Sequence, residues 1–358
     1  MAKEIKLWIF LLIIGLHAGI AQNIGISWKM ANRQEKKWYA SVEAQRIADN
    51  VLLYQHENGG WYKNIDMADK LNSREKDSLK KLKMMSVGTT IDNGATYSQL
   101  NYLAKVYTAT GKQEYGRAFM KGLFYLLEAQ YEDGGWPQFY PVREGYYEHI
   151  TFNDGAMIGV MELLRNISRK NEPYKFVSAS GRKKAKKAIE KGLRVILATQ
   201  VNVDGKLTIW CAQHNKDDYT PAKARAYELP SLSGKESVGI VEYLLRLENP
   251  SEEVKLSIRS AVEWFEEHKV TGKKVVLIKD TSYVDGYDRV VIEDTLASPL
   301  WGRFNDLNTG TPIFVGRDGK IKQHLADIEQ ERRMGYNYID NYAEKLLKKE
   351  YPEWEKRN

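Results

Sequence analysis

The stretch AQYEDGGWPQFY at residues 129–140 is repeated within this 358-residue chain. A similar stretch, YQHENGGWY, occupies residues 54–62, and a weaker third copy, TQVNVDGKLTIW, occupies residues 199–210. The glutamine near the start of each copy recurs after 75 and then 70 residues. Each copy follows an amphipathic stretch, where glycine can take the left-handed conformation of a helix C-cap. The repeat therefore predicts units that each end a helix in a Gly-rich turn.

Apolar residues between these copies recur with the i, i+3, i+4 spacing of helices that bury one face. Such stripes lie within residues 44–52, 119–127, 157–164 and 238–245. A period of about 70 residues that contains two helices is typical of stacked helical hairpins. The sequence thus predicts a mainly α fold, an α/α toroid whose loops gather at one mouth.

The pattern changes toward the C-terminus. Three runs alternate or are rich in β-branched residues: KKVVLI (273–278), RVVIED (289–294) and TPIFVGRDGKIKQ (311–323). Asp318-Gly319 is a hairpin turn signal within the last run. We expect a small antiparallel β appendage packed on the helices, with helical structure again in residues 341–357.

The first residues have the pattern of a secretory signal peptide. Two lysines precede an apolar run at residues 7–16, and small residues end the segment at Ala21. We expect residues 1–21 to be removed and the chain to be exported. An uncleaved anchor is the alternative, although the apolar run is too short to span a membrane. No Gly/Ser/Pro-rich linker divides residues 22–358, which are predicted to form one domain.

Composition narrows the class of partner. The chain is 43% hydrophobic and 28% charged, with 22 Tyr and 9 Trp, and its formal net charge is +7. A basic balance favours nucleic acid, an anionic membrane or a polyanionic substrate. Export argues against nucleic acid and leaves the polyanion. Cys211 is the single cysteine, so no intramolecular disulfide forms.

Two related motifs open the helices between the repeat copies: TIDNGAT (90–96) and TFNDGAM (151–157). Asp92-Asn93 and Asn153-Asp154 occupy corresponding places in them. These residue types are preferred helix N-caps, which would be a purely structural role. In adjacent hairpins, however, both acids would reach the same mouth, where carboxylate and amide oxygens suit a hard cation such as Ca²⁺. Because helix N-termini repel cations, a metal there would also need an anionic ligand from a substrate.

Other candidates each have a structural alternative. Trp61 and Trp136 follow the repeated Gly-Gly turns, where they could stack on sugar rings or pack the hairpin ends. Cys211 and His214 have the spacing of metal ligands, but a lone pair favours ordinary packing. The basic run GRKKAKKAIEKG (181–192) contains no interleaved aromatic residue, which indicates a solvated helix face.

Four arginines stand out by their surroundings. Arg225 lies in AKARAYELPSLSG (222–234), among alanines that offer no carboxylate. Arg303, Arg317 and Arg332 lie in Gly-containing loop contexts. Each alone is compatible with an ordinary surface charge, but the planar guanidinium fork is the natural reader of carboxylates.

Five motifs together resemble the pectate lyases of polysaccharide lyase family 10: TIDNGATYSQL, GGWPQFYP, TFNDGAM, WCAQHNKDDYTPAKARAYELPSLSG and RFNDLNTGTPIFVGRDG. The likeness runs from about Trp38 to Arg357, nearly the whole mature chain. It implies an α/α toroid, in agreement with the repeat, and a Ca²⁺-assisted β-elimination on polygalacturonate. We expect a monomer.

Individual roles follow from the motifs that match. The resemblance implies that Arg225 is the base and that Asp92 and Asp154 flank Ca²⁺ and the substrate carboxylate, with Asn93 beside them. The later substrate-binding arginines correspond to Arg303, Arg317 and Arg332, and Trp136 is the predicted sugar platform. Lowering an arginine pKa from its ordinary value to about 9 costs roughly 5 kcal/mol. Ca²⁺ and neighbouring guanidinium groups act in that direction, so we expect an alkaline optimum and no carboxylate partner for Arg225.

Two rival functions remain open at this point. A glycoside hydrolase on the same fold would use Asp92 and Asp154 as its carboxylate pair. A non-catalytic uronan-binding module would need the arginines but not Asp154. Elimination leaves an unsaturated uronide that absorbs in the ultraviolet and stops when EDTA removes the metal, whereas neither rival gives that absorbance.

Overall fold

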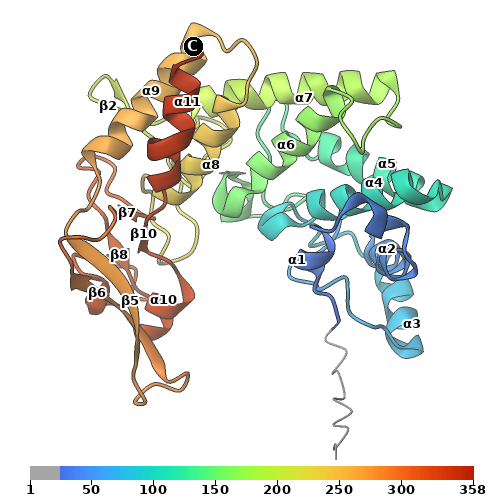
Figure 1. The fold of residues 1–358 in the computed structure, drawn as a ribbon, viewed down its shortest axis with the longest axis horizontal. Coiled ribbons are helices and arrows are strands. Elements are labelled where there is room, and N and C mark those ends of the chain that lie inside the picture. Colours follow the sequence, from blue (N-terminus) through green and yellow to red (C-terminus); the bar gives the residue numbers. More distant parts are fainter. Residues whose placement is uncertain (1–24) are drawn as a thin grey trace, which may run out of the picture.

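The computed structural model describes residues 25–358, so the predicted signal peptide at residues 1–21 lies outside the described residues. Helices dominate, and the strands form only two-stranded antiparallel pairs (Figure 1). Within the described residues, no helix is both long enough and apolar enough to cross a membrane.

The helices form two packed rows, an α/α toroid as the repeat predicts (Figure 1). One row contains, in contact order, α2 (Val42–Tyr54), α5 (Gln113–Glu128), α7 (Ala179–Ala198) and α9 (Glu252–Glu267). The other contains α4 (Tyr97–Thr110), α6 (Ala156–Ser168) and α8 (Gly234–Leu245). Shorter helices are α1 (Trp28–Ala31), α3 (Ser73–Leu82), α10 (Gln330–Gly335) and α11 (Tyr351–Glu355). All four predicted apolar stripes fall on helices of these rows.

The repeated glutamine joins each helix of the first row to the next. The Gln55 side-chain amide donates to Ala118 O of α5 at 2.9 Å. Gln130 makes the equivalent bond to α7 at 2.9 Å and Gln200 to α9 at 3.0 Å. Since buried backbone carbonyls need partners, a long-range bond repeated three times fixes the spacing of the row.

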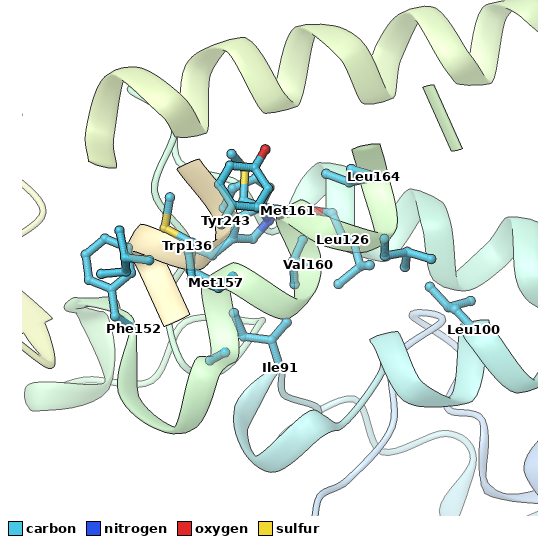
Figure 2. Close-up of a cluster of buried hydrophobic side chains, with 14 of the residues drawn as sticks. Ile91, Leu100, Leu126, Trp136, Phe152, Met157, Val160, Met161, Leu164 and Tyr243 are labelled. Atoms are coloured by element: carbon cyan, nitrogen blue, oxygen red, sulfur yellow. Dashed lines mark hydrogen bonds between the residues drawn. The ribbon is translucent and has the colours of Figure 1, made fainter. Parts of the chain in front are cut away.

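The repeated tryptophan lies inside the core, so the prediction of Trp136 as a sugar platform is wrong. Its side chain is fully buried, and its indole N–H donates to Leu126 O at 2.8 Å (Figure 2). Trp61 and Trp210 bond the preceding helix in the same way. Trp301 does so after α9, which reveals a fourth copy that the sequence reading missed. The indole fills the space between helices and hydrogen-bonds a carbonyl at a helix end. Of the two predicted roles, packing of the hairpin ends is therefore the one observed.

The glycines of the repeat are not helix C-caps, contrary to expectation. The capping residues are Gln55, in an extended conformation, and Ala129, in a right-handed one. Gly59 and Gly134 come several residues later with φ of 95° and 120°. A Cβ on either would lie 2.4 Å from a carbonyl oxygen of the next helix in the row. Glycine is therefore required by its positive φ and by a close approach between units.

The predicted β appendage is present and has its own hydrophobic core. Its pairs are β5 (Lys273–Lys279) with β6 (Tyr287–Glu293), β7 (Trp301–Gly302) with β10 (Ile339–Asp340), and β8 (Phe314–Val315) with β9 (Ile321–Lys322). The turn at Asp318-Gly319 joins β8 and β9 as predicted. Two further pairs lie among the helix loops: β1 (Ile150–Thr151) with β4 (Gln213–His214), and β2 (Asn202–Val203) with β3 (Lys206–Leu207). The appendage core is separate from the helical one and includes Tyr227, Phe304 and Tyr338.

Candidate active site

A polar cleft of about 510 Å³ is lined by residues from the helix loops and from the β appendage. Five of the eight predicted site residues line it: Asp92, Asn93, Asp154, Arg225 and Arg303. The first three come from adjacent hairpins of the toroid, and Arg303 follows β7 in the appendage. The tertiary fold thus gathers residues that are up to about 210 positions apart in the chain.

The Asp92-Asn93 and Asn153-Asp154 pairs do not cap α4 and α6, so a purely structural role as helix N-caps is excluded. They form short 3₁₀ turns, η2 (Asp92–Gly94) and η4 (Asn153–Gly155), that pack against each other. Neither turn uses a side chain as a cap, and α4 and α6 begin after them at Tyr97 and Ala156. Asn93 and Asp154, at equivalent positions, have φ of 50° and 49°. Asn and Asp tolerate this left-handed conformation, and such residues often cluster at functional sites.

Each candidate carboxylate already attracts cationic or donor groups. Lys63 forms an ion pair with Asp92, and the Gln138 amide donates to the same carboxylate at 2.6 Å. The Lys235 ammonium lies 2.6 Å from Asp154 Oδ1. Burial alone would raise the pKa of Asp154, but Lys235 and the guanidinium of Arg303 outweigh it and lower that pKa. Asp154 therefore stays ionised.

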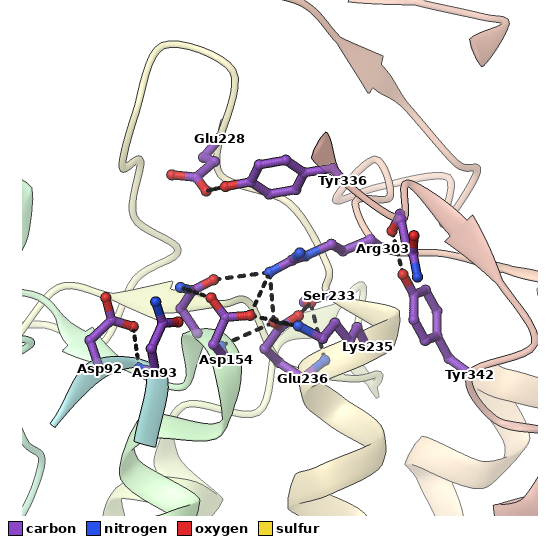
Figure 3. A network of polar contacts seen from close by, with 12 residues as sticks. Asp92, Asn93, Asp154, Glu228, Ser233, Lys235, Glu236, Arg303, Tyr336 and Tyr342 are labelled. Atoms are coloured by element: carbon purple, nitrogen blue, oxygen red, sulfur yellow. Dashed lines mark hydrogen bonds and ion pairs between the residues drawn. The ribbon is translucent and has the colours of Figure 1, made fainter. Parts of the chain in front are cut away.

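Arg303 is fixed at the floor of the cleft beside Asp154 (Figure 3). Its Nη2 lies 3.1 Å from Glu236 Oε1 and 3.2 Å from both Asp154 Oδ1 and Asn153 Oδ1. Burial alone would lower the pKa of Arg303, but Glu236 and Asp154 raise it above its ordinary value. This guanidinium is a permanent cation held in one orientation.

Arg225 has a carboxylate partner, so the prediction that it is unpaired is wrong. Its Nε and Nη2 donate to the two oxygens of Glu228 at 2.8 and 2.7 Å. Glu228 also accepts from the hydroxyl of Tyr336 at 2.9 Å. The bidentate pair raises the pKa of Arg225 above its ordinary value. The partner is not among the flanking alanines but stands three positions after Arg225, where the turn brings it back to the guanidinium.

The four predicted arginines converge around two tyrosine rings. Tyr227 and Tyr336 lie edge to face, with ring centroids 5.8 Å apart. The guanidinium carbons of three arginines lie within 6.0 Å of Tyr227, namely those of Arg225, Arg317 and Arg332. Those of Arg225, Arg303 and Arg332 lie within 5.7 Å of Tyr336. Cation–π contacts of this kind hold like charges together at a desolvated site.

Arg317 and Arg332 belong to this cluster but do not line the cleft. Both form ion pairs with Glu331. Arg317 lies at the surface, with its Nη2 2.7 Å from Glu331 Oε1, and Arg332 is buried. Arg332 also has a buried Nη1 without a hydrogen-bond partner in the described residues. A direct substrate contact thus has less support for these two than for Arg225 and Arg303.

Several cleft residues escaped the sequence reading. These are Lys63 and Gln138, which each stand two positions after a repeat tryptophan, just as the predicted Arg303 stands two positions after Trp301. After Trp61, Trp136 and Trp301 the buried indole thus places the second residue beyond it at the mouth, whereas Ala212, two positions after Trp210, does not line the cleft. Arg143 lines the cleft as well, with its guanidinium 4.8 Å from the Phe139 ring and 4.7 Å from that of Tyr147.

Two other candidates have structural roles, as the sequence reading favoured. His214 is buried, accepts the backbone N–H of Cys211 at Nε2, and bonds Tyr219 O through Nδ1. Burial lowers the pKa of His214 to about 4, so the ring is neutral. The basic run at residues 181–192 lies on α7, with most of its lysines exposed and outside the cleft.

The comparisons place this arrangement among known enzymes. The sequence model of a family described as pectic acid lyase matches residues 55–347. A solved structure of the family 10 polysaccharide lyase from Cellvibrio cellulosa is 36% identical, with a TM-score of 0.74 over 87% of this chain and 93% of that one. A mutant of the Cellvibrio enzyme in complex with trigalacturonic acid is 35% identical over the same shares, also with a TM-score of 0.74. A search of the curated proteins gave no match.

The helical toroid and its cleft of carboxylates and arginines therefore define this protein as a polysaccharide lyase. Enzymes of this class cleave acidic glycans by elimination. The chain belongs to the pectic acid lyase family, within family 10 of the polysaccharide lyases.

Proposed function

We propose that this protein cleaves (1→4)-α-D-galacturonan by β-elimination, with Arg225 as the base. The observation that supports this most directly is that Arg225, Arg303, Asp92 and Asp154 line one cleft. Family membership gives the reaction class, and the trigalacturonic acid bound by the Cellvibrio relative gives the substrate class. The basic charge of the chain agrees with a polyanionic substrate.

In this proposal, the guanidinium groups bind the uronate whose C5 proton is removed. Arg303, fixed by Glu236 and Asp154, presents a permanent positive charge where enolate-like charge develops on the substrate carboxylate. A neutral Arg225 takes the C5 proton, the C4–O4 bond breaks, and a C4=C5 double bond forms. The departing O4 is protonated by solvent, and no water adds to the sugar.

Arg225 acts as a base only after it leaves Glu228, because the bidentate pair favours its charged form. Its side chain is 43% exposed, so a substrate in the cleft can reach it. The pairing therefore describes a resting arrangement in which Glu228 holds the base, and a substrate carboxylate in the cleft would compete with Glu228 for Arg225.

The residues present fit a calcium ion shared with the substrate. Asp92, Asp154 and the amide oxygen of Asn93 are hard oxygen ligands of the kind that Ca²⁺ prefers. Lysines on both carboxylates mark them as cation-attracting positions. Among residues 25–358 no cluster of three or more acidic, His or Cys side chains completes a site, so substrate carboxylates would supply the remaining ligands. When bound, the ion would disperse negative charge on the substrate carboxylate.

Arg225→Ala and Arg225→Lys test the base assignment on polygalacturonate by ultraviolet absorbance of the unsaturated product. General-base catalysis contributes about 10²- to 10⁴-fold, and we expect kcat losses of that size. Arg225→Ala/Glu228→Gln provides a control that leaves no buried carboxylate unpaired, and it should be equally inactive but fully folded. A wild-type rate in the alanine variants rules out Arg225 as the base.

The same assay separates the rival functions. A hydrolase yields new reducing ends without ultraviolet absorbance, and a binding module yields neither. EDTA stops the elimination, and added Ca²⁺ restores it. We further propose that residues 22–358 form one catalytic domain that is exported, which the N-terminal charge and hydropathy pattern supports.

A further inference from the structure

Two more hollows continue from the cleft toward the N-terminal segment. The first, of about 300 Å³, shares with the cleft Lys63, Asn64 and Asn93. The second, of about 700 Å³, shares with the first Trp28, Lys29, Asn93 and Ser98. Because neighbouring hollows share lining residues, the three lie next to one another in a row from the cleft to α1, which we call the groove. Each of the two is large enough to hold a small ligand.

The added part of the groove is basic. Lys29 and Arg33 line it, are exposed, and have no acidic partner in the part of the chain that the structure describes. Two acidic residues also line it, and neither forms an ion pair with Lys29 or Arg33 in the described residues. Asp66 accepts the backbone N–H of Trp28 at 2.9 Å, and Glu172 pairs with a neighbouring lysine. The positive charges of Lys29 and Arg33 therefore line a groove that leads to the cleft.

The segment that carries these charges is held firmly in place. The bond from the Trp28 backbone to Asp66 ties α1 to the loop after the first repeat copy. At the other end of α1, the Lys105 ammonium donates to Asn32 O at 2.6 Å. Trp28 packs on Tyr102 with ring centroids 5.0 Å apart. A groove wall fixed in this way loses little conformational entropy when a ligand binds.

We propose that residues 27–33 form distal subsites for a galacturonan chain that extends beyond the cleft. Lys29 and Arg33 bind the carboxylates of outlying sugars, and Trp28 lines the path between them. The inference rests on the proposed function, because a polyuronate carries one carboxylate per sugar and so repeats its charge along the groove. The match of the family model begins at residue 55, after these residues.

The test is Lys29→Gln/Arg33→Gln, assayed on trigalacturonate and on long polygalacturonate at low ionic strength. We expect KM for the polymer to rise about tenfold more than KM for the trimer, with kcat for the polymer kept. The matched control, Lys183→Gln/Lys187→Gln, removes the same charge from exposed positions on α7 and should leave the ratio of the two KM values unchanged. Equal effects of both double variants, or an unchanged ratio in Lys29→Gln/Arg33→Gln, overturn the proposal.

A second readout separates this inference from the lyase assignment. Binding of hexagalacturonate and trigalacturonate is measured by calorimetry in the Arg225→Ala background, where substrate is not consumed. Lys29→Gln/Arg33→Gln should weaken binding of the hexamer more than that of the trimer. If the wild type gives no unsaturated product but this difference persists, the proposed function fails and the distal subsites stand. If the wild type is active and the difference is absent, the subsites fail alone.

Discussion

Glu228 is the residue that decides whether Arg225 can act as a base. It accepts two side-chain bonds from Arg225, one from the Arg225 backbone N–H at 3.2 Å and one from Tyr336. Burial would raise the pKa of Glu228, but these bonds lower it, so the carboxylate stays charged at neutral pH. Because the pair stabilises charged Arg225, the base is neutral only at high pH or after the pair opens.

Glu228→Gln should therefore move the ascending limb of the kcat–pH profile to lower pH. Removing an adjacent opposite charge lowers the pKa of a cation by about 1–3 units, and a larger fraction of Arg225 is then neutral at any given pH. The measurement is the initial rate on saturating polygalacturonate across the alkaline range. Glu228→Asp keeps the charge and should keep the wild-type limb. A limb that stays in place in both variants means that Arg225 is not the titrating group.

At the scale of elements, the repeat explains how buried residues place functional ones. Each repeat indole bonds the preceding helix, and after Trp61, Trp136 and Trp301 the chain emerges at the mouth two residues later. Lys63 and Gln138 reach Asp92 from these positions, and Arg303 reaches Asp154. The toroid thus supplies equivalent sites on successive hairpins, and different side chains at those sites give each a different role.

Trp136→Ala should destabilise the protein without a specific loss of substrate binding. Truncating a fully buried tryptophan leaves a cavity and removes the partner of Leu126 O, at a cost of about 3–5 kcal/mol. Thermal unfolding measures the loss, and KM for polygalacturonate below the melting temperature should stay close to wild type. Trp136→Phe keeps most of the volume and should cost less. A raised KM with an unchanged melting temperature would instead favour the sugar platform that the sequence predicted.

At the scale of the whole molecule, the cleft joins two bodies of different architecture. The toroid contributes the carboxylates of Asp92 and Asp154, and the β appendage contributes Arg303 and Tyr336. Each body has a hydrophobic core, Trp301 of β7 packs into that of the toroid, and polar contacts such as Arg303 with Asp154 join the two walls at the cleft. A ligand that bridges both walls should therefore stabilise the whole molecule.

Ca²⁺ and trigalacturonate should together raise the melting temperature of Arg225→Ala by more than the sum of their separate effects. The described residues hold no group of three or more acidic, His or Cys side chains that could bind the ion, so the substrate completes its ligand set and each ligand strengthens the other. Differential scanning fluorimetry measures the shifts, with EDTA as a blank. Mg²⁺, which demands a stricter octahedral geometry, should give a smaller shift. A full shift with Ca²⁺ alone would mean that the protein holds a complete site by itself.

The sequence by itself determined the toroid, the β appendage and the family. These follow from features that the sequence itself carries: apolar residues at helical spacing, glycines at positions where a positive φ or a close approach requires them, and motifs in a fixed order. Helical spacing acts within one or two turns of the chain, and the repeat and the motifs recur in a regular order, so both can be read along the sequence.

Only the tertiary structure decided which residues are inside and which meet. It buried Trp136, paired Arg225 with Glu228, and gathered four arginines around Tyr227 and Tyr336. These outcomes depend on how a turn folds back and on how hairpins pack against the appendage. A guanidinium or an indole has the same local signature whether it faces solvent, a carboxylate or the core, because its environment is set by residues far away in the chain.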